Sequence, residues 1–315
     1  MSQTGSSSIT TLSNPLVSNS QTATHNLARR KTAQTLAFML IWLSGLIAIA
    51  AVVWIIGYVM IQGASIVDLE FLTTRPQGGM DGEGGMSTTI VTTLYLVSLT
   101  IAIAAPLGIG AAVYLVEYAT EASRESKFIA RLISLSRSGV EILAGVPSII
   151  FGLFGFALFV SAMKLKFSLL SAGLSGACLI LPVIIRTSEE ALLSVPRSLR
   201  EGSLALGATR WQTIWGVVLP AALPGIITGI VLSIGRIIAE TAVFWVTLGG
   251  SYRLPKNLLS SGRTMALHVY MLASETRAFE RAMGTAAVLI IVMIILNLVI
   301  NYLSRRLTAR ATGQR

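Results

Sequence analysis

Residues 196–224 read PRSLREGSLALGATRWQTIWGVVLPAALP, a polar segment between long apolar stretches. Pro196 is typical of a first helical turn, and Gly207 can adopt the left-handed conformation that ends a helix. Thr209 followed three residues later by Gln212 is a capping-box pattern and predicts that a second helix begins at once. The second helix would present an apolar face of Trp211, Ile214, Trp215 and Val218, and would end at Leu219, Pro220 and Pro224.

The wider segment 187–222 is too polar to cross a bilayer, and it predicts two short helices hinged at a glycine. Such a helical knob suits docking into a groove on another protein. The alternative is a surface connector without a partner, and these residues alone leave both interpretations open. We expect three arginines of the knob to be exposed: Arg197, Arg200 and Arg210.

On either side of this segment the chain is strongly apolar. Of its 315 residues 53% are hydrophobic and 12% charged, about half the charged share of a soluble domain. A helix needs about 20 apolar residues to cross a bilayer. The sequence therefore predicts an all-α integral membrane protein with six transmembrane helices. They are Thr35–Ile61, Ser87–Leu115, Gly139–Ala162, Ser168–Ile185, Leu223–Val246 and Met283–Leu303.

The distribution of basic residues orients these spans. With the N-terminus in the cytoplasm, fifteen Arg and Lys residues fall in cytoplasmic segments and eight in outer segments. The excess of basic residues on the inner side predicts that both termini are cytoplasmic. The chain then consists of a disordered cytoplasmic tail (1–34), a first transmembrane helix (35–62), a transmembrane core (86–304) and a C-terminal cytoplasmic tail (305–315).

Several kinds of site are not expected. The net charge of +10 follows from the membrane topology and does not imply nucleic acid. The single cysteine, Cys178, cannot form an internal disulfide, and two histidines are too few for a metal site. No lysine follows a glycine, so the core of a phosphate-binding P-loop is absent. We expect no cofactor, no metal and no catalytic residue, so energy for transport must come from another chain.

Two places in the spans combine charge with a predicted break. Gly145 and Pro147 should break or kink the third span, and breaks at membrane depth occur only against protein or a wet cavity. Arg137 and Glu141 precede this break, and they either line a path or merely pair. In the fifth span a buried charge costs about 2.5–3.5 kcal/mol on insertion scales. Arg236 and Glu240 lie four residues apart there and are expected to pair and face the bundle interior.

The Arg236–Glu240 pair has two interpretations. It either orients helices as a neutralised pair or forms part of a translocation site. A guanidinium binds oxyanions such as phosphate with bidentate geometry, so the second interpretation favours an oxyanion as the substrate.

The polar segment resembles the coupling motif of ABC-importer permeases. That motif is Glu-Ala-Ala, three residues, Gly, nine residues, Ile, any residue, then Leu-Pro, and in the family the loop inserts into a nucleotide-binding subunit. Gly202 and Ser203 replace two alanines here, and Val217 replaces Ile. The resemblance implies the type I (MetI-like) ABC-importer permease fold. The ATPase-coupling residues would be Glu201, Gly202, Ser203, Gly207, Leu219 and Pro220.

Other stretches are similar to phosphate ABC permeases, and together they cover about residues 85–300. The resemblance implies one half of a channel in the bacterial plasma (inner) membrane that imports phosphate by alternating access. It also implies a second permease subunit, two ATPase subunits and a periplasmic or surface phosphate-binding protein. The substrate path would use Arg236, Glu240, Arg137 and Glu141. The similar stretches are Thr92–Val97, Pro106–Ala112, Leu143–Ser148, Phe151–Gly155, Ser233–Ala242, where Ala239 replaces the usual Gly, and Leu254–Ala273.

Three alternatives stay open. The substrate could be another oxyanion, such as molybdate or sulfate. The chain could be a secondary transporter with Glu141 or Glu240 as a proton relay. It could also have a signalling or scaffold role, for which the sequence shows no contact.

Overall fold

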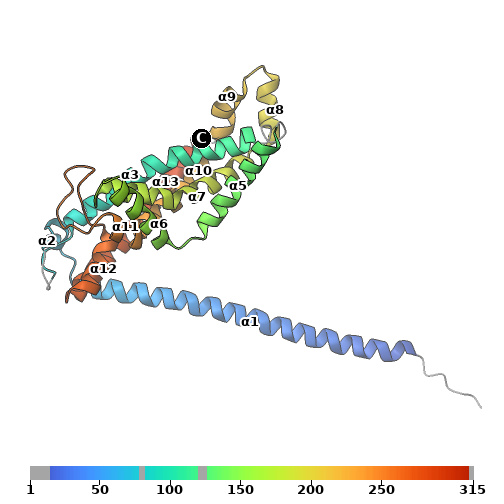
Figure 1. Ribbon diagram of the computed structural model, residues 1–315. Coiled ribbons are helices and arrows are strands. Elements are labelled where there is room, and N and C mark those ends of the chain that lie inside the picture. Colours follow the sequence, from blue (N-terminus) through green and yellow to red (C-terminus); the bar gives the residue numbers. More distant parts are fainter. Residues whose placement is uncertain (1–14, 78–81, 120–125, 312–315) are drawn as a thin grey trace, which may run out of the picture. The chain divides into compact units, whose positions relative to one another are not determined.

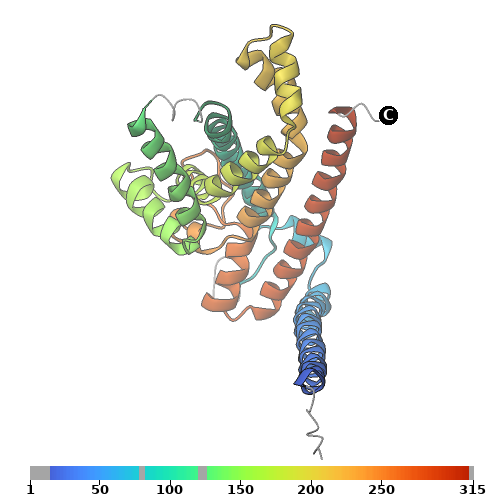
Figure 2. The same ribbon diagram turned by 90° about the vertical axis from the view of Figure 1, so that its right-hand side faces the viewer.

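The computed structural model describes residues 15–77, 82–119 and 126–311. It divides into two units, residues 1–58 and residues 59–315, which are described separately. Figures 1 and 2 show the fold from two directions. All regular elements of the described residues are helical, apart from two isolated bridges, Pro76 with Gly84 and Gly249 with Gly262.

The first unit is formed by helix α1 (Pro15–Ala64), whose apolar part continues into the second unit. In this unit Trp42 is 78% and Trp54 77% exposed. We expected disorder over residues 1–34, but residues 15–34 are helical, and residues 1–14 lie outside the described residues. Extending an existing helix adds one hydrogen bond per residue, which lets an apolar span continue into polar flanking sequence.

In the part of the chain that the structure describes, five helices are long and apolar enough to cross a membrane, and a bent pair supplies a sixth crossing if it counts as one span. The crossings that are not interrupted by the bend are Gln34–Ala64 of α1; α3 (Ser87–Val113) with the π-helical η1 (Tyr114–Tyr118); α7 (Leu169–Leu193); α9 (Arg210–Thr213) with the π-helical η3 (Ile214–Val218) and α10 (Leu219–Ala239); and α13 (Phe279–Ala311).

The predicted third span, Gly139–Ala162, is not one straight helix. Helix α5 (Lys127–Ala144) and helix α6 (Ser148–Gly155), which continues into the π-helical η2 (Phe156–Ala162), meet at 107°. Gly145 caps the end of α5 and Pro147 precedes the first turn of α6. The expected break at these residues is confirmed. A proline restricts the residue before it to an extended conformation, which ends the preceding helix.

The fifth span differs from the expectation at both ends. Pro220 and Pro224 do not separate it from the helix that begins at Arg210, because Pro220 lies in the first turn of α10 and the π-helical η3 joins the two. At its other end α10 stops at Ala239, and Glu240 is extended (φ −73°, ψ 130°) before the short α11 (Ala242–Thr247). The predicted continuous span Leu223–Val246 is therefore wrong beyond residue 239.

The core of the second unit lies where α3, α6, α7, α10 and α11 meet. Leu96, Ile180 and Phe244 are fully buried there. Gly108 permits close packing of α3 on α7, because a Cβ at this position would lie 2.6 Å from the Ile184 side chain. Small residues of this kind let transmembrane helices approach closely.

The segments of the second unit group at two opposite ends. Helices α8 (Arg197–Ala205) and α9 project at one end, whereas α2 (Leu69–Thr73) and α12 (Met265–Glu275) lie at the other (Figures 1 and 2). The loop between α11 and α12 contacts the first residues of the second and fourth spans there. Thr88 Oγ1 donates to Tyr252 O at 2.9 Å, and Leu169 N donates to Ser260 O at 3.0 Å.

Candidate functional site

The helical knob, α8 and α9 with the turn between them, forms as its sequence predicts. Gly207 has φ +86°, the left-handed conformation expected after a helix end. Both capping-box bonds are present, because Gln212 N donates to Thr209 Oγ1 at 3.3 Å and Thr209 N donates to Gln212 Oε1 at 2.8 Å. Pro196 is the residue before the first helical turn, one position earlier than expected.

The knob presents an open apolar tip. Leu206 is 91% exposed, and a Cβ added at Gly202 or Gly207 would meet no atom within 4 Å. Glu201 and Pro220 are also exposed, whereas Ser203 and Leu219 are half-buried. Ser203 Oγ lies 2.9 Å from Thr213 Oγ1, a hydrogen bond that braces α8 against α9. An apolar tip on a braced pair of helices suits insertion into another protein.

The predicted apolar face of the second helix divides into two parts. Ile214 and Val218 are buried, as expected, while Trp211 and Trp215 are 60% and 55% exposed and pack edge to face, with ring centroids 5.4 Å apart. An apolar groove of about 560 Å³ lies between η3 and the end of α3. The aromatic residues that line it are Tyr114, Tyr118, Trp211 and Trp215.

The expectation of three exposed arginines on the knob is wrong at one position. Arg197 and Arg210 are exposed, but the Arg200 side chain is only 18% exposed. Arg200 contacts Glu117 of η1, a residue 83 positions earlier in the chain. Nothing local in the sequence signals this contact.

Arg137 and Glu141 lie in a cluster of charges between α5 and α7. Arg137 Nε is 3.7 Å from Glu189 Oε1, and Glu141 Oε1 accepts a 2.9 Å bond from Arg186 Nη1. Within the described residues the two therefore pair with α7 rather than with each other. The three α7 residues, which sequence reasoning missed, surround a cavity of about 210 Å³ together with Arg137 and Glu141. They are Arg186, Glu189 and Glu190.

Arg236 and Glu240 do not form the expected pair, and Arg236 does not face the bundle interior. Arg236 is exposed in the last turn of α10, where its positive charge faces the negative end of the helix dipole. Glu240 lies past the helix end, and its Oε1 accepts a 3.3 Å bond from Val243 N. No carboxylate of the described residues lies within ion-pair distance of Arg236. The break after Ala239 removes the helical spacing on which the predicted pairing depended.

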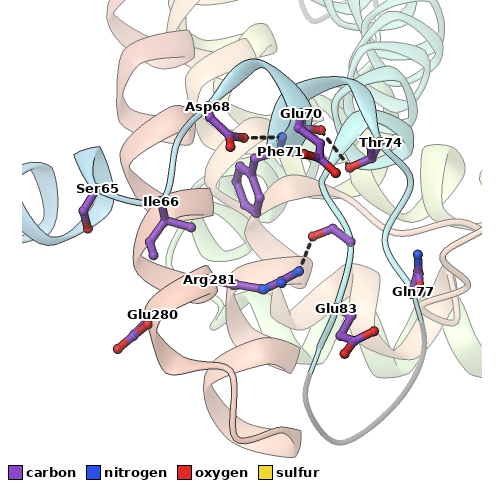
Figure 3. A pocket seen from close by; sticks show the side chains of 11 residues that line it. Ser65, Ile66, Asp68, Glu70, Phe71, Thr74, Gln77, Glu83, Glu280 and Arg281 are labelled. Atoms are coloured by element: carbon purple, nitrogen blue, oxygen red, sulfur yellow. Dashed lines mark hydrogen bonds between the residues drawn. The ribbon is translucent and has the colours of Figure 1, made fainter.

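A pocket of about 530 Å³ opens at the end opposite the knob (Figure 3). Asp68 caps α2 through a 2.6 Å bond from Phe71 N, and Arg281 Nη1 donates to Gly84 O at 2.6 Å. Three exposed carboxylates, Glu70, Glu83 and Glu280, also line the pocket. Like charges repel across short distances, so this pocket is a poor place for an anion.

A buried arginine stabilises the loop between α11 and α12. Arg263 Nε donates to Gly250 O at 2.9 Å, and its guanidinium lies 4.9 Å from the ring centroid of Tyr252. Arg263 Nη1 is 3.2 Å from His268 Nδ1, which accepts because arginine can only donate. Burial and the Arg263 charge lower the pKa of His268 to about 3. Burial also lowers the pKa of Arg263. His268 is therefore a neutral partner of a structural arginine.

The amino-acid sequence is similar to those of known membrane transport proteins. The family model described as "Binding-protein-dependent transport system inner membrane component" matches residues 104–313. A probable ABC transporter permease protein, YqgI of Bacillus subtilis, is 31% identical over 278 residues, which cover 83% of this chain and 92% of the relative. The phosphate transport system permease protein PstA 1 of Mycobacterium tuberculosis is 34% identical over 269 residues, covering 84% of this chain and 86% of the relative.

Solved structures share the fold. A bacterial alginate ABC transporter in complex with a periplasmic protein superposes with a TM-score of 0.61 at 17% identity, covering 85% of this chain and 95% of that chain. The inward-facing MetNI methionine ABC transporter superposes with a TM-score of 0.54 at 21% identity, covering 70% and 93%. The MetI-like permease fold expected from the sequence is therefore confirmed.

Proposed function

We propose that this chain, which belongs to the family of binding-protein-dependent transport system inner membrane components, is the permease subunit of an ATP-driven importer of inorganic phosphate. The observation that carries the proposal is the helical knob, whose Glu201, Gly207 and Leu219-Pro220 match the coupling motif and whose tip is open. The relatives named as phosphate transport permeases support phosphate as the substrate.

The knob would be the docking element for an ATPase subunit. Leu206 at its tip would enter an apolar groove of the ATPase, and the polar residues around it would fix the orientation. In this arrangement the chain supplies the path and the ATPase supplies the energy. Two ATPase copies would serve this chain and a second, related permease subunit.

Arg236 would be the anion-binding group of the translocation path. Its exposure on this single chain suits a path that lies between two permease subunits rather than inside one. A guanidinium without a carboxylate partner can offer two parallel N–H donors to phosphate. Glu240 is proposed to limit occupancy to one anion by repulsion. Arg137 and Glu141 would lie where the path reaches the knob end.

The knob end of the second unit would face the cytoplasm, and the end with α2 and α12 would face a periplasmic or surface phosphate-binding protein. The excess of basic residues in the knob-side segments supports this orientation. Both chain termini would then be cytoplasmic, in the bacterial plasma membrane.

Uptake of radiolabelled phosphate into vesicles that contain the assembled importer tests the proposal. Uptake should require ATP inside and the binding protein outside, and it should resist an excess of sulfate or molybdate. Competition by either anion would indicate a different oxyanion importer. Uptake that continues without ATP and stops when the proton gradient is removed would indicate a secondary transporter.

A further inference from the structure

A partly buried ion pair joins the helical knob to the end of the second span. Arg200 Nη2 and Nε both donate to Glu117 Oε1, at 3.0 and 3.1 Å. The two side chains are 18% and 15% exposed, so the pair is largely shielded from water. Arg200 belongs to α8 and Glu117 to η1.

The same guanidinium also holds the end of α7. Arg200 Nη2 donates to Leu192 O at 2.7 Å and Nη1 donates to Val195 O at 2.6 Å. Carbonyls at a helix C-terminus have no partner within the helix, and a cation is favourable there. One side chain of α8 therefore bonds to both the second and the fourth span.

The knob is also connected through the backbone, from α7 into α8 and from α9 onward. Helix α9 continues through η3 into α10, the fifth span, without an interruption. The ion pair to the second span and the backbone connection to the fifth span both involve π-helical turns, η1 and η3. π-Helical turns are rare in proteins and occur frequently at functional positions.

We infer that Arg200 and Glu117 are positioning residues that make the second span move together with the knob. This inference rests on the proposed function. When the ATPase displaces the knob, the fifth span follows through the backbone of η3. The second span, which also packs on α7 and α10, follows the knob through the Arg200–Glu117 pair. Transport per ATP then depends on a contact that touches neither phosphate nor nucleotide.

The test measures phosphate taken up per ATP hydrolysed by the assembled importer in vesicles. Glu117→Gln keeps the side-chain size and removes the charge, and it should lower this ratio by about fivefold or more, since it leaves the guanidinium without its carboxylate. Arg200→Lys keeps the charge but loses the forked contact, and it should lower the ratio in a complex that assembles normally. Arg131→Gln, at an exposed arginine of α5 outside the knob, is the matched control and should leave the ratio unchanged.

A double variant separates transmission from simple destabilisation. If the pair acts as a unit, Glu117→Gln combined with Arg200→Lys should be no worse than the more harmful single change. An unchanged ratio in both single variants, or losses that multiply in the double variant, would overturn the inference. Absence of phosphate uptake by the unaltered importer would instead refute the proposed function, so the two failures are distinguishable.

Discussion

Arg186 joins the two sides of the charge cluster, because its Nη1 donates to Glu141 Oε1 at 2.9 Å while its Nε lies 3.5 Å from Glu190 Oε1. The Glu141 bond connects α5, on one side of the 107° bend, to α7. Both side chains are more than half exposed. A pair with that exposure contributes little to stability, so we expect it to act in the proposed path rather than to stabilise the fold.

Glu141→Gln tests this distinction. Removing one carboxylate leaves Arg186 less neutralised, and phosphate competes with carboxylates for a guanidinium. We expect the maximal uptake rate to fall a few-fold while the free energy of unfolding changes by less than about 1 kcal/mol. Stopped uptake assays and thermal unfolding in detergent measure the two quantities. A large loss of stability with normal uptake would assign the pair to the fold.

Arg236→Ala should lower uptake by about tenfold to a hundredfold, the value of a charge-assisted hydrogen bond to an anion. The complex should still assemble, because the side chain is exposed and has no ion-pair partner among the described residues. Arg253→Ala, at an exposed arginine of the outer loop, is the matched control. Normal uptake by an assembled Arg236→Ala importer would remove Arg236 from the proposed path.

Gly207→Ala should weaken binding of the ATPase. A non-glycine residue at φ +86° costs about 1–2 kcal/mol, and the added Cβ meets no atom within 4 Å, so the cost comes from the backbone alone. We expect roughly a tenfold loss of affinity in a pull-down titration if the strain reorients α9. Gly202→Ala lies inside α8 with equally open surroundings and should be neutral or stabilising. Equal effects of the two substitutions would contradict this reasoning.

Leu206→Asp should detach the ATPase and leave the permease folded. Leu206 is 91% exposed, so its substitution should change the free energy of unfolding by less than about 0.5 kcal/mol. A carboxylate in an apolar groove without a partner is strongly unfavourable. Co-purification checks whether the ATPase is lost, and thermal unfolding checks whether the permease keeps its stability. Retention of the ATPase at normal stoichiometry would show that the tip is not the docking element.

Acid should loosen the outer loop through His268. The pKa of His268 is about 3 in the fold and about 6.5 when the chain is unfolded. Between these values the unfolded state binds more protons than the folded state. The contribution of neutral His268 to the free energy of unfolding is therefore fully present above about pH 6.5, and it falls as the pH drops toward 3. The loss at pH 5 should be about 2 kcal/mol relative to pH 7.5. Thermal unfolding at both pH values should show this difference, and His268→Gln should reduce it.

Local chemistry made part of this molecule predictable. The two helices around Gly207 follow from a capping box and a glycine, which act within a few residues. The break at Gly145 and Pro147 follows equally from backbone restrictions. Five of the expected spans follow from apolar length alone, although their ends do not.

The remaining features depend on contacts between distant segments. The end of α10 at Ala239 has no local helix-breaking signal, because residues 236–246 contain neither proline nor glycine. The predicted Arg236–Glu240 pair fails for this reason. The Arg200–Glu117 contact spans 83 positions, and the charges of α7 enter the site only because that helix extends to Leu193.

The π-helical turn at Ile214–Val218 sets the direction in which the knob points. A π-helical turn contains one residue more than an α-helical turn, and one residue of α-helix corresponds to a rotation of about 100°. Deleting a single residue from this turn would convert it to ordinary helix and rotate the knob by about that angle relative to the fifth span. The direction in which the knob presents Leu206 to its partner thus depends on the number of residues in one helical turn and not on which residues they are.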